Sequence, residues 1–155
     1  MTTVLKQPDG DGCLIAVPDF TENEADRRIL IVDDDAAVRN LFADYLAESY
    51  ICTTAASSDE ALAHLAIDTY ALVISDMPGQ NGIQLLEEIQ ARCPGTAVIM
   101  VSGIDRPQRI RDALRIGAFD YLTKPCALDV LALSVERALE RRALMLTARS
   151  DHPSK

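Results

Sequence analysis

Short apolar runs alternate with amphipathic stretches five times between residues 28 and about 148, and this alternation limits the possible folds more than any other feature. The apolar runs are rich in β-branched residues and are predicted to be strands, at 29–32, 51–55, 71–75, 97–101 and 119–122. Continuously apolar strands must be covered on both faces, which is typical of parallel sheets flanked by crossover helices. The sequence therefore predicts an α/β fold, a doubly wound five-stranded parallel sheet.

Several of the intervening helices have recognisable starts and ends. The capping box Ser57-Ser58-Asp59-Glu60 predicts a helix over about 59–66. Pro107 fits the first turn of a helix, and Gly117 fits the residue beyond its end. Another helix is expected to begin at Asn81 or Gly82. The first helix is predicted from an apolar pattern at helical spacing: Val38, Leu41, Phe42, Tyr45 and Leu46.

The chain divides into three parts. Residues 1–27 are polar and contain Pro and Gly, so we expect a flexible N-terminal arm. Within the arm only Cys13–Val17 is strand-like, and it could add to a sheet edge, bind a partner or be a sticky piece of tail. Residues 28–142 form the domain. Residues 143–155 continue the last helix, expected from Leu128 to Ala148, and end in a tail.

Composition excludes some kinds of protein. A net charge of -9 argues against direct nucleic-acid binding, which needs clustered Lys and Arg. No apolar run reaches the ~18–20 residues of a membrane span. The four cysteines are far apart and form no CxxC pair, so we expect free thiols in a cytoplasmic protein.

Polar residues stand where the predicted strands end. Asp33 and Asp34 follow the first strand, Asp76 ends the third, Ser102 ends the fourth, and Lys124 follows the fifth. In a flavodoxin-like strand order, 2-1-3-4-5, strands one and three flank the switch point, so their acids should converge. Crowded carboxylates repel one another, and Mg²⁺ removes the conflict while keeping positions for phosphate oxygens. One carboxylate could then attack phosphorus, with Lys124 and Ser102 contacting the phosphoryl oxygens.

Four motifs carry a resemblance to a known family. They are Ile-Leu-Ile-Val-Asp33-Asp34-Asp35, Leu-Val-Ile-Ser-Asp76, Val-Ser102-Gly and Gly117-Ala-Phe-Asp-Tyr121-Leu-Thr-Lys124-Pro125. In this order and spacing the sequence resembles receiver domains of bacterial two-component response regulators over residues 28–142. The sequence from Gly117 to Pro125 is most similar to that of receivers that precede σ54-dependent ATPase activators.

The resemblance implies a role for each matching residue. Asp76 would be the phosphoacceptor, and Asp33, Asp34 and Asp76 would hold Mg²⁺. Ser102 and Tyr121 would form a switch pair, Lys124 would contact the phosphate, and the peptide before Pro125 would be cis. The expected partners are a histidine kinase or phosphotransfer protein and a downstream output protein or domain. The protein would accept and lose phosphate by its own chemistry without being an enzyme in the ordinary sense.

Some residues have a simpler interpretation. Asp35 precedes Ala36-Ala37-Val38 and is assigned to capping the first helix. The family has two more residues between the phosphoacceptor and the Met-Pro pair, whereas Met77-Pro78 follow Asp76 directly. The backbone carbonyl that completes the family's metal site would therefore belong to Pro78, in a shortened loop. This departure keeps open an alternative: a degenerate receiver that works as a phosphorylation-independent interaction module.

The last helix adds one further hypothesis. Leu128, Leu131, Val135 and Leu139 make an apolar stripe, and Ala143 and Leu146 extend it past the end of the domain. An uncovered stripe favours a homodimer through the last helix, whereas a frayed tail would leave the chain monomeric.

Overall fold

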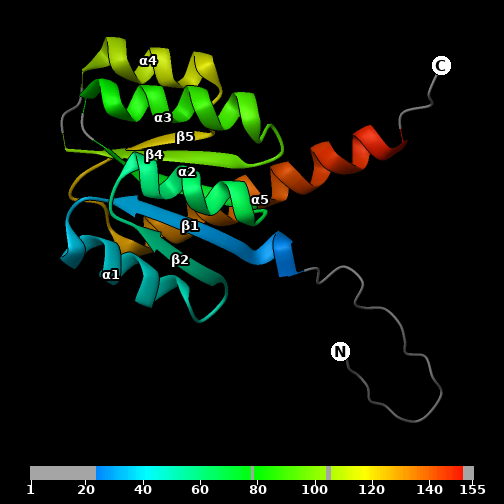
Figure 1. The fold of residues 1–155 in the computed structure, drawn as a ribbon, viewed down its shortest axis with the longest axis horizontal. Coiled ribbons are helices and arrows are strands. Elements are labelled where there is room, and N and C mark those ends of the chain that lie inside the picture. Colours follow the sequence, from blue (N-terminus) through cyan, green and yellow to red (C-terminus); the bar gives the residue numbers. More distant parts are fainter. Residues whose placement is uncertain (1–23, 78, 104–105, 152–155) are drawn as a thin grey trace.

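The computed structural model describes residues 24–77, 79–103 and 106–151 (Figure 1). Five parallel strands lie in the order β2-β1-β3-β4-β5, which confirms the predicted doubly wound α/β sheet. The strands are β1 (Arg28–Asp33), β2 (Ile51–Ala55), β3 (Leu72–Asp76), β4 (Ala97–Ser102) and β5 (Asp120–Thr123). The helices are α1 (Ala36–Leu46), α2 (Ser58–Ile67), α3 (Gly79–Arg92), α4 (Pro107–Ile116) and α5 (Leu128–Asp151).

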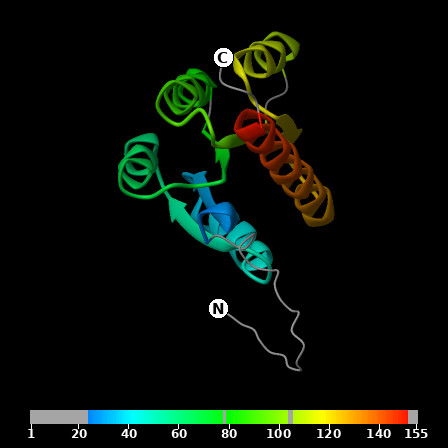
Figure 2. The same cartoon turned by 90° about the vertical axis from the view of Figure 1, so that its right-hand side faces the viewer.

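The helices cover the sheet in two layers (Figure 2). On one face, α2, α3 and α4 pack over a core that includes Leu30, Val73 and Val98. On the other face, α1 and α5 pack over a core that includes Ile31 and Ile74. Neighbouring residues of β1, β3 and β4 thus serve opposite cores, which explains why these strands are apolar without interruption.

Local signals produce most of the helix ends. Ser57 Oγ accepts a hydrogen bond from the Glu60 N–H at 3.1 Å, which confirms the predicted cap, and the Glu60 carboxylate accepts one at 2.7 Å from the Ala56 N–H, one residue before the capping serine. Pro107 occupies the first turn of α4. Gly117 follows α4 with φ of 139°, a conformation that favours glycine.

The predicted helix α1 is confirmed, and one other helix prediction needs correction. Phe42 and Leu46 are the buried residues of α1, while Leu41 and Tyr45 of its apolar pattern are 52% and 41% exposed. Helix α3 begins at Gly79, earlier than the expected Asn81 or Gly82. The early start follows from the short connection, since α3 begins three residues after the last residue of β3.

Arg142 on α5 holds two segments that precede strands, at the amino end of the sheet. Arg142 donates from Nε to the Gly95 carbonyl oxygen at 2.6 Å and from Nη1 to Asp26 at 3.0 Å. These contacts fix the α3–β4 connection and the 3₁₀ turn Glu24–Arg27 to the same helix. Beyond them α5 continues past the sheet (Figure 1), and Leu144 and Met145 are 70% and 51% exposed. No helix in the described ranges could cross a membrane.

Candidate functional site

The paired acids lie side by side at the carboxyl edge of the sheet. Asp33 ends β1 and Asp76 ends β3, and the register of the two parallel strands places them directly opposite each other. Lys124 follows β5 and reaches back over this edge, where its Nζ forms an ion pair with Asp76 and lies 3.4 Å from Asp33 Oδ2. Asp33 and Lys124, which are 91 positions apart in the chain, thus meet Asp76 in one cluster, as the sequence predicts.

The electrostatics of the cluster are those of two crowded acids sharing one cation. The Asp33 side chain is only 1% exposed, and this burial raises its pKa above the ordinary value of 3.8. The nearby Asp76 raises the pKa of Asp33 further, while the Asp35 N–H and Lys124 act in the opposite direction. Burial alone would lower the pKa of Lys124, but Asp76 and Asp33 outweigh it and raise that pKa, so the ammonium group stays charged.

The turn between β1 and α1 holds the acids in place. Asp33 Oδ1 accepts a hydrogen bond from the Asp35 N–H at 2.9 Å. Asp35 in turn caps α1 by accepting from the Ala37 N–H at 2.9 Å, which confirms its predicted role. Asp34, between them, is exposed. The structure therefore separates the three acids into a buried member, an exposed member and a helix cap.

Ser102 and Tyr121 lie on neighbouring strands beside Lys124. The Ser102 carbonyl oxygen accepts a hydrogen bond from the Lys124 N–H at 2.8 Å, so the end of β4 is tied to the residue that carries the ammonium group. Tyr121 is half-buried and pairs in register with Met100, two residues before Ser102. Because side chains alternate along a strand, Ser102, Met100 and Tyr121 share the face covered by α4. The peptide between Lys124 and Pro125 is cis, as expected.

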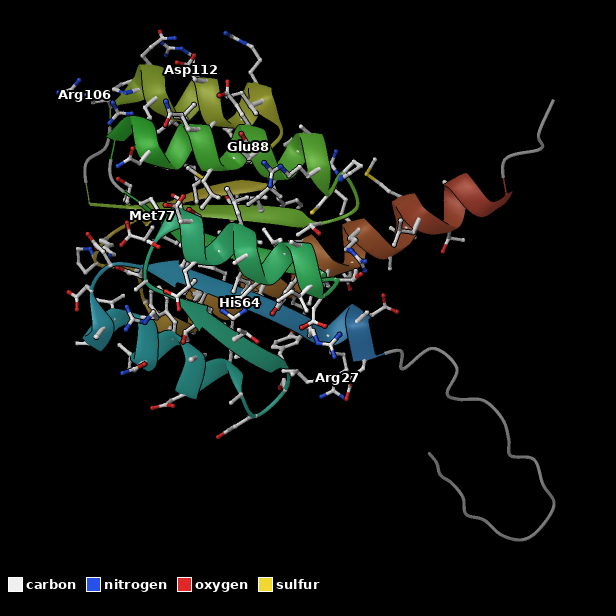
Figure 3. The ribbon with its side chains drawn as sticks, viewed as in Figure 1. Arg27, His64, Met77, Glu88, Arg106 and Asp112 are labelled. Carbon is white, nitrogen blue, oxygen red and sulfur yellow. The ribbon has the colours of Figure 1, made fainter. Side chains whose placement is uncertain are left out.

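The connection after Asp76 is unusually tight. Met77 lies at the edge of the sheet where the strands end (Figure 3), and its side chain packs against the core under α2 and α3. The Met77 carbonyl oxygen lies so close to Gly82 that a Cβ atom there would come within 2.6 Å of it. Pro78, whose carbonyl was the expected metal ligand, lies outside the described residues. Glycine at position 82 therefore permits the close approach of the connection and α3.

The acid pair suits an open site for a hard cation. Mg²⁺ usually takes one or two carboxylates and completes its shell with water and phosphate oxygens. Asp33 and Asp76 supply such oxygens, and the pKa of Asp33 is raised by burial and then by Asp76, so a bound cation would stabilise the charged form of both acids. Across the described part of the chain, no group of three or more His, Cys, Asp or Glu side chains is arranged to enclose a metal. The two acids thus fit Mg²⁺ as an open site, while Asp34 is not brought into such a group.

Sequence reasoning missed two contributors to this site. Arg39, on α1, donates from Nη1 to the Asp33 carbonyl oxygen at 2.8 Å. Gly82 makes room for the Met77 carbonyl. A basic residue one turn into a helix that follows an acidic turn could have pointed to Arg39. The contact of Gly82 had no local signal, because it depends on how the short connection folds back.

The fold and the site together define a class of protein: a doubly wound α/β domain that gathers acids and a lysine at the carboxyl edge of its sheet. The model of the response regulator receiver domain family matches residues 29–136. The chain therefore belongs to this family, the receiver domains of response regulators in two-component systems.

Similar proteins support this assignment. The chain is 37% identical over 126 residues to the C4-dicarboxylate transport transcriptional regulatory protein DctD of Rhizobium meliloti, covering 79% of this chain and 27% of that protein. It is 38% identical over 114 residues to the DNA-binding transcriptional regulator NtrC of Salmonella typhimurium, covering 72% and 24%. Relatives of this kind confirm the resemblance to receivers of σ54-dependent activators.

Solved structures agree with the fold. The crystal structure of a CheY-like receiver domain protein from Methanospirillum hungatei superimposes with a TM-score of 0.73 at 31% identity, covering 77% of this chain and 98% of that one. NtrX from Brucella abortus gives a TM-score of 0.76 at 34% identity, covering 83% and 30%. The chain spans about a quarter of the length of DctD and NtrC, so it corresponds to one domain of such regulators.

Proposed function

We propose that this receiver takes a phosphoryl group from a histidine kinase or phosphotransfer protein onto Asp76. The observation that carries the proposal is the cluster of Asp33, Asp76 and Lys124, in which a charged ammonium group lies between two crowded carboxylates at the carboxyl edge of the sheet. Asp33 lies directly opposite Asp76 on the neighbouring strand, and two carboxylates in such proximity favour binding of a hard cation.

The chemistry can be assigned to residues of this chain. A carboxylate oxygen of Asp76 attacks phosphorus, the P–N bond to the donor histidine breaks, and the leaving histidine nitrogen keeps the electron pair and takes a proton from water. Lys124 releases its ion pair with the Asp76 carboxylate and pairs with a phosphoryl oxygen instead. Asp33 and Asp76 would hold Mg²⁺, and Asp34, exposed on the same turn, would have to move toward them to join as a third ligand. The metal would neutralise negative charge on the acids and the phosphoryl group when bound.

The response would travel through Ser102 and Tyr121. Both lie on the face covered by α4, and Ser102 adjoins Lys124 through a backbone hydrogen bond. A hydrogen bond donated by the Ser102 hydroxyl to a phosphoryl oxygen would favour one of two arrangements of this region, and Tyr121 would follow it. The output then depends on a downstream protein or domain that recognises the changed face.

Phosphoryl transfer can be tested with acetyl phosphate and Mg²⁺, followed by intact mass measurement. The wild-type chain should gain one phosphoryl group, and Asp76→Asn should gain none. Asp44→Asn is the matched control, because Asp44 is exposed on α1 outside the acidic turn and its loss should leave labelling intact. The alternative, a degenerate receiver that acts only by docking, predicts no labelling. An unlabelled wild-type chain that keeps its fold would support that candidate and refute ours.

A further inference from the structure

One contact beside the acid pair has no part in the function proposed above. Arg39 Nη1 donates a hydrogen bond to the backbone carbonyl oxygen of Asp33 at 2.8 Å. We propose that Arg39 is a positioning residue that holds the turn Asp33–Asp35 so that its acids face Asp76. This inference rests on the proposed function, because it concerns how the same site is kept ready for a cation.

The turn is held from both sides. Within the turn, Asp33 Oδ1 accepts from the Asp35 N–H at 2.9 Å, so the buried carboxylate is fixed by the residue two positions on. At its far end, Asp35 caps α1 through the Ala37 N–H at 2.9 Å and accepts the Arg39 N–H on its backbone oxygen at 3.0 Å. The guanidinium of Arg39 adds a hydrogen bond from α1 back to the backbone carbonyl of Asp33.

The hydrogen bond from Arg39 to Asp33 couples α1 to the end of β1. The other hydrogen bonds lie within the turn or between the turn and α1, whereas Arg39 joins α1 directly to the last residue of β1. A hydrogen bond from a charged donor is about twice as strong as a neutral one. Without it, α1 and its capped turn could shift relative to Asp76, and the exposed Asp34 would shift with them.

Arginine suits this task better than other donors. Its planar guanidinium reaches along the helix and keeps a fixed direction for its hydrogen bonds, while lysine offers a flexible point charge. Its positive charge also lies beside a turn that carries three consecutive aspartates. Lys124 cannot replace this charge, because its ammonium group is engaged with Asp76 and Asp33 at the other side of the site.

The test compares Arg39→Ala, Arg39→Lys and Arg39→Gln with the control Arg111→Ala. Arg111 lies on α4 and bonds only Gln108 on an exposed surface among the described contacts, so its loss removes a similar side chain away from the site. The first readout is amide hydrogen exchange over residues 33–38 in EDTA, where no metal contributes. We expect faster exchange there in Arg39→Ala than in the wild type, and no change in Arg111→Ala.

The second readout is Mg²⁺ affinity by titration calorimetry. Loss of a residue that orients metal ligands typically weakens metal binding about 10–100-fold, so we expect at least about a tenfold loss in Arg39→Ala. Arg39→Lys should recover part of the affinity, and Arg39→Gln should recover less, since it keeps a donor without the charge. If Arg39→Ala does not fold, the Lys and Gln variants carry the comparison.

Two results would overturn the inference. Unchanged exchange over residues 33–38 in Arg39→Ala would show that the contact does not hold the turn. A lower thermal stability with unchanged Mg²⁺ affinity would show that Arg39 only stabilises α1. Failure of the proposed function is a separate outcome: a wild-type chain that binds no Mg²⁺ and accepts no phosphate would refute that function, while exchange in EDTA still decides whether Arg39 holds the turn.

Discussion

The tight connection after Asp76 predicts that Gly82→Ala destabilises the domain. A Cβ atom at position 82 would lie 2.6 Å from the Met77 carbonyl oxygen and 3.3 Å from Met100 Cε. The Met100 side chain can yield, but the carbonyl is backbone and would have to move by about 0.8 Å to reach the 3.4 Å of ordinary contact. Such overpacking typically costs about 1–3 kcal/mol.

Part of this cost is offset, because alanine favours helix over glycine by about 0.5–1 kcal/mol. The expected net loss in unfolding free energy is therefore about 1–2 kcal/mol, or a decrease in melting temperature of roughly 2–8 °C. Urea unfolding followed by circular dichroism measures it. Gly95→Ala is the matched control, since a Cβ there meets nothing within 4 Å and should change stability by less than about 0.5 kcal/mol. If Gly82→Ala is as stable as Gly95→Ala, the connection is not as tight as we describe.

Four further predictions follow from the site and from α5. Burial and Asp76 raise the pKa of Asp33, so the folded protein binds more protons than the unfolded chain and the unfolding free energy in EDTA should fall as pH rises above 3.8 through the raised pKa. Urea titrations of Asp33→Asn should lack this fall, and an equal fall in that variant would contradict the prediction. Lys124→Met leaves the two acids without their cation and should lower the unfolding free energy in EDTA by about 1–3 kcal/mol, less than for a fully buried pair because Lys124 is 26% exposed. In thermal melts, added Mg²⁺ should stabilise this variant more than the wild type. Restoring two residues after Asp76 should tighten Mg²⁺ binding in calorimetry, whereas unchanged affinity would show that the short connection is harmless. Light scattering should show a dimer through α5 at tens of micromolar, on the order expected for a weak helix pair, and Leu144→Glu with Met145→Glu should make it monomeric; a monomeric wild type would rule the dimer out.

Much of the fold could be predicted because its signals are local. Strands buried on both faces must be apolar throughout, so β1, β3 and β4 stand out in the sequence. The capping box at Ser57 and the proline at position 107 fix two helix starts by their own hydrogen bonding and backbone geometry. The convergence of Asp33 and Asp76 also followed from the sequence, because parallel strands in this order end at one edge.

The remaining features depend on contacts between distant parts of the chain. The exposure of Leu41 and Tyr45 could not be predicted from spacing, because spacing does not report how much of the apolar side of α1 the rest of the fold covers. The contact of Arg39 with Asp33 requires the relative placement of a helix and a strand end. The early start of α3 depends on the short distance in sequence between β3 and the helix, and helical spacing alone does not report that.

The central claim is that Asp76 carries the phosphoryl group, and mapping the acyl phosphate tests it most directly. The phosphorylated chain can be reduced with borohydride, which converts an aspartyl phosphate to homoserine, and the site can be read by peptide mass spectrometry. The account predicts homoserine at position 76 only, with Mg²⁺ required and the signal absent in Asp76→Asn. Homoserine at position 33 or 34, or at no position in a folded, Mg²⁺-loaded chain, would contradict it.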